Sequence, residues 1–126
     1  METNFDYLLE KSEYASFAEQ AVEAEKSIAI SPATCAILSR RALELAVRFV
    51  FSYDAELSLP YRDNVSSLIH EPTFRSIIEP RLFPMLKYTI HLGNVAVHTN
   101  NNIKRDEAII ALRDLFEFCD WIDYSY

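Results

Sequence analysis

Apolar residues recur every three or four positions along nearly the whole chain, and no stretch alternates apolar and polar residues as a half-buried strand does. This spacing predicts an all-α protein. The predicted elements are a short turn over residues 4–9, helices over residues 12–30, 32–53, 62–69 and 72–78, a helix from Arg81 to a polar loop at residues 99–102, and a last helix over residues 105–124. No linker, repeat or low-complexity tract interrupts them, so we expect a single helical domain over residues 1–126, a bundle of five or six helices.

The predicted helix over residues 32–53 has the clearest start. Ser31 supplies a capping hydroxyl, and proline at position 32 suits the first helical position. Its apolar residues form two seams, one of Cys35, Leu38, Ala42, Leu45 and Phe49, the other of Ala36, Leu43, Val47 and Val50. A helix that is apolar on two faces is buried on both, so we expect it at the centre of the bundle, with a turn over Gly93–His98 packed against it.

Composition and charge narrow the class of protein. The chain has 126 residues, half of them hydrophobic, which is enough to bury a core without disulfides or metal. The net charge of -7 argues against a self-sufficient nucleic-acid binder, which normally carries a basic face. Cys35 and Cys119 lack metal-like spacing and are expected to be buried small hydrophobes. Without a signal peptide or an apolar run of about 20 residues, the chain is expected in the cytoplasm with no membrane partner.

Gly93 is the only glycine, where average usage would give roughly nine. A lone glycine is expected where a side chain cannot fit. Three explanations are open: a turn that needs positive φ, the end of a helix, or a point where two backbones touch.

Two polar constellations are candidates for a binding pocket. Glu44 lies within helical reach of Arg40, Arg41 and Arg48, either as an internal ion pair that orders helix packing or as part of a pocket. Asn94 and His98 form an i,i+4 pair, and the histidine is either a satisfied core residue or a functional one. Because buried polar groups need partners, we expect Glu44 to pair with an arginine of its own helix and to lie near Asn94 or His98.

Common catalytic motifs are missing. The sequence has no phosphate-binding glycine loop, no dinucleotide-binding glycine motif, no nucleophile elbow and no H-E-x-x-H. The three histidines share no metal-ligand spacing, so no metal site is expected. An independent nucleotide hydrolase is not expected either.

Taken together, several segments resemble the helical amino-terminal domain of the R (HsdR, restriction and translocation) subunit of type I restriction-modification enzymes. These segments are Asn4–Leu8, Ala21–Ile30, Arg40–Glu44, Gly93–His98 and Trp121–Tyr124. The resemblance covers the whole chain and implies a non-catalytic module that contacts other domains of the R subunit or the modification and specificity subunits. It implies that DNA is reached only through the whole complex, and that ATP and magnesium serve nuclease and motor domains outside these residues.

That domain is similar in turn to the wider HEPN helical superfamily, several members of which are ribonucleases with an Arg-Asn-x-x-x-His motif. Asn94 and His98 match this motif, but Gly93 stands at the arginine position. A ribonuclease of this type would need the arginine for charge stabilisation and the histidine for proton transfer. The alternative function is therefore a stand-alone HEPN-like protein that binds RNA or a nucleotide, as a degenerate or active ribonuclease.

Overall fold

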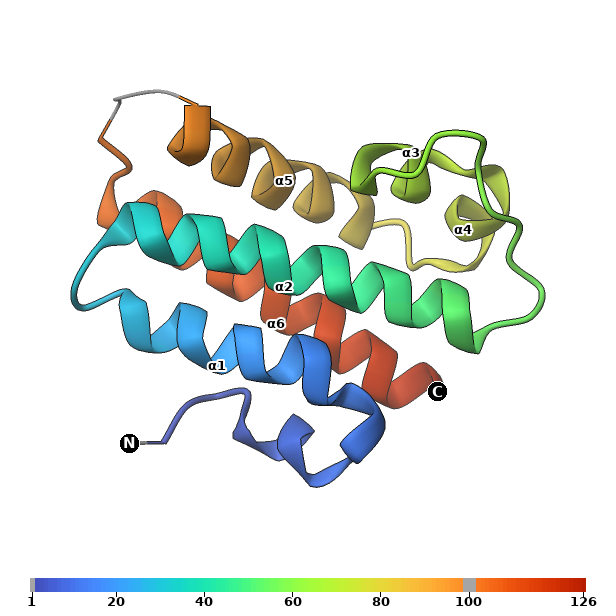
Figure 1. The fold of residues 1–126 in the computed structure, drawn as a ribbon, viewed down its shortest axis with the longest axis horizontal. Helices are drawn as coiled ribbons and strands as arrows, with labels where there is room; N and C mark the ends of the chain where they lie inside the picture. Colours follow the sequence, from blue (N-terminus) through green and yellow to red (C-terminus); the bar gives the residue numbers. More distant parts are fainter. Residues whose placement is uncertain (1, 99–101) are drawn as a thin grey trace.

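The computed structural model describes residues 2–98 and 102–126, and within them the chain is helical without any strand. The all-α prediction is confirmed. Six α-helices lie in these ranges: α1 Ala15–Ser27, α2 Pro32–Tyr53, α3 Val65–His70, α4 Pro72–Ile77, α5 Leu82–His98 and α6 Arg105–Ser125. Two short 3₁₀ helices precede them, η1 Asp6–Glu10 and η2 Ser12–Tyr14. The long helices pack side by side in a single bundle, and α3 and α4 cover one end of it (Figure 1).

Helix α2 has the predicted bounds and the predicted central place. The Ser31 hydroxyl oxygen accepts a hydrogen bond from the Thr34 backbone N–H at 3.1 Å, which caps the helix, and Pro32 begins it. One face of α2 packs against α1 and another against α5 and α6. The two apolar seams are therefore explained by two sets of neighbours.

Three other predicted elements differ from the structure at their ends. The helix expected over residues 12–30 begins as the separate turn η2 and ends at Ser27, whose carbonyl accepts hydrogen bonds from the N–H groups of Ile30 and Ser31. The helix expected from residue 62 begins three residues later, because the Asn64 side chain caps Ser67 N–H at 2.8 Å. Gly93–His98 is not a turn but the last part of α5. Of the predicted loop at residues 99–102, only Asn102 is among the described residues, and it lies outside the helices.

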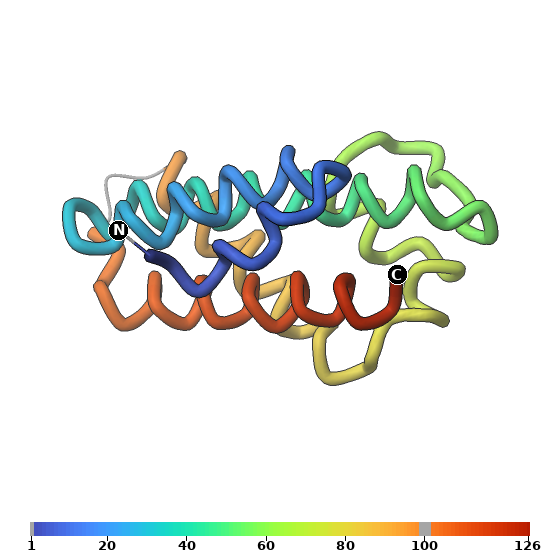
Figure 2. Tube along the Cα trace, turned by 90° about the horizontal axis from the view of Figure 1, so that it is seen from below, coloured from blue at the N-terminus to red at the C-terminus, as the bar shows by residue number. Residues whose placement is uncertain are grey.

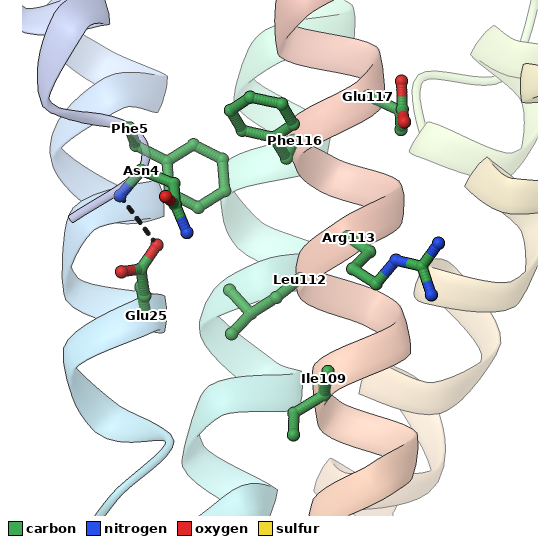
Figure 3. Close-up of a pocket in the computed structure, with 8 residues that line it drawn as sticks. All are labelled: Asn4, Phe5, Glu25, Ile109, Leu112, Arg113, Phe116 and Glu117. Atoms are coloured by element: carbon green, nitrogen blue, oxygen red, sulfur yellow. Dashed lines mark hydrogen bonds between the residues drawn. The ribbon is translucent and has the colours of Figure 1, made fainter.

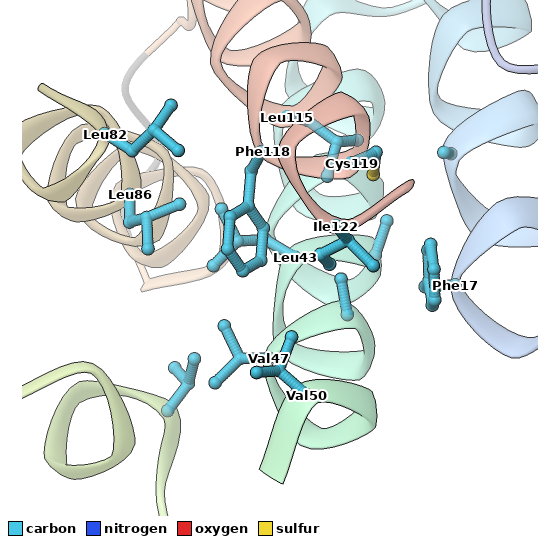
Figure 4. Packing of buried hydrophobic residues seen from close by; sticks show 14 of the residues in the cluster. Phe17, Leu43, Val47, Val50, Leu82, Leu86, Leu115, Phe118, Cys119 and Ile122 are labelled. Carbon is cyan, nitrogen blue, oxygen red and sulfur yellow. The ribbon is translucent and has the colours of Figure 1, made fainter. Parts of the chain in front are cut away.

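The core lies between α2, α5 and α6, with Phe17 of α1 on the other side of α2 (Figure 4). Phe118, Leu43 and Val47 are all fully buried there. A second, smaller cluster of buried side chains contains Cys35, Ala36, Leu92, Ile103, Ala108 and Ala111. Cys35 and Cys119 are both free and buried, as predicted.

The N-terminal segment, residues 3–11, lies between α1 and α6 (Figure 2). It buries Phe5, whose ring meets Phe116 of α6 edge to face at 5.8 Å. Lys11 Nζ pairs with Asp123 at 2.9 Å, and the Tyr7 hydroxyl donates to Asp120 at 3.3 Å. The segment thus fills part of the space between two helices that make few contacts with each other.

Candidate functional site

The single glycine marks a close approach of two helices. Gly93 lies inside α5 without positive φ, so the turn and helix-end explanations are wrong. A Cβ atom at Gly93 would lie 2.5 Å from Cβ and 2.8 Å from Cδ of Arg40 on α2. Carbon atoms are in normal contact at about 3.5–4 Å, so no side chain fits at position 93 without movement of α2 or Arg40.

Arg40 occupies the space that the missing side chain leaves. Its aliphatic stem lies against Gly93, and its Nε atom is buried without a hydrogen-bond partner among the described residues. A buried N–H without an acceptor costs free energy. The packing of the arginine stem on the glycine must offset this cost, and it restricts the positions that the side chain can adopt.

Glu44 pairs with an arginine of its own helix, as predicted, but that arginine is Arg48. The Glu44 carboxylate accepts from Arg48 Nε at 3.2 Å and from Nη2 at 3.1 Å, while Arg48 Nη1 reaches Asp63 at 2.7 Å. The Glu44 and Arg48 side chains are 31% and 37% exposed, so the pair lies at the rim of the bundle and not inside it. The three residues tie α2 to the connection before α3, and Arg41 is exposed.

In the described residues, no hydrogen bond or ion pair joins the predicted polar residues into one cluster. Asn94 is half-buried and His98 is exposed, and within residues 2–98 and 102–126 neither side chain makes a hydrogen bond or an ion pair. No such bond links Glu44 to either of them in the same ranges. Among the candidate residues in the described part of the chain, Arg40 and Gly93 are in close contact.

A groove that the sequence patterns did not predict lies between the N-terminal segment, the end of α1 and α6. Its volume is about 380 Å³, and it is lined by Asn4, Phe5, Glu25, Ile109, Leu112, Arg113, Phe116 and Glu117. Ile109, Leu112 and Phe116 lie toward Phe5 and Glu25, whereas Arg113 and Glu117 project from the edge of α6 that is farther from the N-terminal segment (Figure 3). The Asn4 backbone N–H donates to Glu25 Oε1 at 3.0 Å and closes one side of the groove.

The sequence does contain a signal for this groove. Residues 109, 112 and 116 are spaced by three and four, so they form an apolar stripe along one side of the last helix. They are only partly buried in the structure, because the N-terminal segment covers the stripe incompletely. An apolar floor with charged residues at its edges is typical of a contact surface for another protein segment.

A buried carboxyl group was also missed. Asp114 of α6 is 6% exposed, and burial raises its pKa to about 6, partly offset by the charge of Arg113. Thr89 of α5 faces it without completing a hydrogen bond. In the sequence, the only sign of this burial is that Asp114 is adjacent to Leu115, which belongs to the buried side of α6.

In the described part of the chain, no group of three or more His, Cys, Asp or Glu side chains is placed to hold a metal ion. None of the helices described is both long enough and apolar enough to cross a membrane.

The chain matches no protein-family model, and comparison with curated proteins and with solved structures also finds no match.

Proposed function

We propose that this chain is a non-catalytic helical module that makes contacts between domains or subunits, like the amino-terminal domain of type I restriction enzyme R subunits that it resembles. Its partners are then the other domains of the R subunit and the modification and specificity subunits. DNA is reached only through that complex. ATP and magnesium belong to the nuclease and motor parts, the module itself takes no cofactor, and the complex works in the cytoplasm.

The groove between the N-terminal segment and α6 is the observation that carries this proposal. It offers Ile109, Leu112 and Phe116 as an apolar floor, with Glu25 at its edge. Apolar centres with polar rims are the usual anatomy of protein contacts. A partner side chain inserted here would bury apolar surface that the bundle leaves partly open.

The contacts of the polar candidates also support a structural role. Arg40 fills the space above Gly93, and Glu44 is held by Arg48. The first arrangement is accounted for by packing between two helices and the second by an ion pair within α2, without any substrate.

Binding to the remainder of the R subunit encoded with this chain tests the proposal. We expect Ile109→Asp to weaken co-purification and to raise the Kd at least tenfold, because a carboxylate would lie on the apolar floor. Ile110→Asp is the matched control, since Ile110 is 44% exposed and does not line the groove. Equal binding by the native chain and both variants, or a coding sequence around this chain with no nuclease and motor regions, would contradict the proposal.

The alternative, an HEPN-like protein that binds RNA, is favoured by one observation. Position 93 lacks the arginine of the ribonuclease motif, but the Arg40 side chain lies directly against Gly93. Arg40 is therefore close to the residue that precedes Asn94 and is the candidate to replace the missing arginine. An RNA cleavage assay of the native chain, His98→Ala and Arg40→Ala separates the two functions. We expect no cleavage by any of them; cleavage by the native chain that both substitutions abolish would favour the ribonuclease.

A further inference from the structure

Helix α5 belongs to the longest basic part of an acidic chain. Between Glu79 and Asp106 there is no aspartate or glutamate, although the whole protein has a net charge of -7. The same stretch contains the basic residues Arg81, Lys87, His91, His98, Lys104 and Arg105. The carboxylates therefore lie in the rest of the sequence, and α5 itself carries none.

Basic side chains from three helices converge on one aromatic ring of α5, that of Phe83. The Arg75 guanidinium lies 3.7 Å from the centroid of the Phe83 ring, and Lys87 Nζ lies 5.7 Å from it. The His70 ring meets Phe83 edge to face at 5.2 Å. Cations are attracted to the face of an aromatic ring, which lets them gather here although like charges repel.

The nearby carboxylates have other hydrogen-bond or ion-pair partners. Glu71 accepts hydrogen bonds from Thr73, and Glu79 pairs with Arg81 at 2.6 Å. Glu44 and Asp63 are both held by Arg48. Within the described ranges, Arg75 and Lys87 form no ion pair.

A cavity of about 220 Å³ opens between α3 and α5 at this cluster. It is lined by Ser66, Ile69, His70, Lys87, Ile90, His91 and Asn94. His70 Nδ1 lies 2.7 Å from the Ser66 carbonyl oxygen and so donates to it, which fixes the ring and leaves Nε2 for another partner. The cavity thus combines one ammonium group with two imidazoles, an amide and a hydroxyl, over an isoleucine floor.

We propose that this cavity binds the phosphate group of a nucleotide or of a nucleic-acid chain. Lys87 supplies the charge, and Ser66, His91 and Asn94 supply hydrogen bonds to the phosphate oxygens. Phosphate suits the site because a terminal phosphate carries up to two negative charges and a phosphodiester one, and both offer oxygen acceptors in a tetrahedral arrangement to several donors at once, whereas a carboxylate has two oxygens in one plane. At roughly 30 Å³ for each water, the cavity has the volume of about seven waters, enough for a phosphate and part of its sugar.

This site goes beyond the proposed contact function and does not depend on it. The groove that carries the contact function lies between the N-terminal segment and α6, whereas α3 and α5 lie on the other side of α2 from α1 and the N-terminal segment (Figure 1). A variant that abolishes one property is therefore expected to leave the other unchanged.

Titration of the full chain with inorganic phosphate, followed by amide chemical shifts, tests the proposal. We expect the shifts to concentrate at residues 66–70 and 87–94, and Lys87→Gln to weaken binding about tenfold through loss of a charged hydrogen bond. Lys26→Gln is the matched control, since Lys26 is an exposed lysine of α1. Acetate at the same concentration is expected to give much smaller shifts.

Three outcomes would overturn the proposal: no phosphate-dependent shifts at α3 and α5, equal weakening by Lys87→Gln and Lys26→Gln, or acetate shifts as large as those of phosphate. An arm with a 5′-mononucleotide and one with a single-stranded RNA of ten nucleotides identify the source of the phosphate. Tighter binding of the RNA than of the mononucleotide, lost in Lys87→Gln, assigns the site to nucleic acid. Equal binding assigns it to a free nucleotide.

Discussion

Gly93 has only a hydrogen atom at the position where any other residue would place a Cβ atom, and that Cβ atom would overlap the Arg40 side chain. We expect Gly93→Ala to lower the free energy of unfolding by about 1–3 kcal/mol, because the new Cβ would lie 2.5 Å from Arg40 Cβ, an atom that cannot move without α2. Helix propensity acts in the other direction, since alanine favours a helix by up to about 1 kcal/mol over glycine. Urea denaturation of the native chain and the variant measures the difference.

The same substitution in an Arg40→Gly background gives the control. Removal of the Arg40 side chain takes away all three atoms that a Cβ at position 93 would meet. We expect Gly93→Ala to cost at least about 1 kcal/mol less there, as residues in contact usually couple by this amount. An equal cost in both backgrounds would show that the glycine is not required by this contact.

Asp114 predicts a dependence of stability on pH. Burial raises its folded pKa from 3.8 to about 6, so between these values the folded state holds a proton that the unfolded state has released. The contribution of this residue is therefore most favourable below about pH 4 and is lost as the pH rises to about 6. We expect Asp114→Asn, which stays neutral, to be more stable than the native chain at pH 7 by on the order of 2 kcal/mol.

Thermal or urea unfolding between pH 4 and pH 8 measures this difference. The gain of Asp114→Asn is expected to shrink toward zero at the acid end, where the native carboxyl is also neutral. Glu19→Gln, at an exposed carboxylate of α1, is expected to change stability by less than about 0.5 kcal/mol at every pH. A gain for Asp114→Asn that is the same at all pH values would contradict the assignment.

Among the elements, the N-terminal segment is expected to contribute more to the stability of the fold than its short length suggests. Phe5 is 1% exposed and touches Phe116, so Phe5→Ala is expected to cost about 3–5 kcal/mol. Leu9 of the same segment is 46% exposed, and Leu9→Ala is expected to cost less than about 0.5 kcal/mol. Chemical denaturation of the two variants decides whether the segment is part of the fold or only lies on it.

Helix α2 could be predicted completely from local signals. The Ser31 cap, the proline that follows it and the two apolar seams are all properties of neighbouring residues, and each has its counterpart in the structure. The end of α1 and the start of α3 were predicted less well, because a turn closed by the Ser27 carbonyl and a cap by Asn64 compete with apolar periodicity. Periodicity reports burial and does not report hydrogen bonds that end a helix.

For the candidate sites, the sequence located Gly93 correctly as a place where no side chain fits, but it could not choose between the reasons. The contact with Arg40 joins positions that are far apart in the chain, so only the packing of α2 on α5 shows it. The sequence predicted that Glu44 pairs with an arginine of its own helix, but it did not show which one. Arg48 is the partner, and it is also held by Asp63 in the connection that follows α2. The cavity beside Lys87 needed α3 and α5 together, and neither helix predicts it alone.

For the molecule as a whole, the net charge predicts a low affinity for duplex DNA. The net charge of -7 opposes the approach of a duplex, although α5 itself carries no carboxylate. We expect the isolated chain to bind duplex DNA with a Kd above about 10⁻⁴ M at physiological salt, the weak end of non-specific binding. Fluorescence anisotropy with a labelled duplex measures this, and a Kd in the micromolar range at that salt would contradict it.

The N-terminal segment also orders the events by which the chain reaches its fold. Phe5 is covered by Phe116, and Lys11 pairs with Asp123, so these residues find their partners only after α6 has been synthesised. Helices α1 and α2, joined by only four residues, can pair as a hairpin long before that. During synthesis, the apolar side of this hairpin that α6 later covers stays exposed to solvent. Chaperones that bind apolar surface are therefore expected to bind it until α6 is complete.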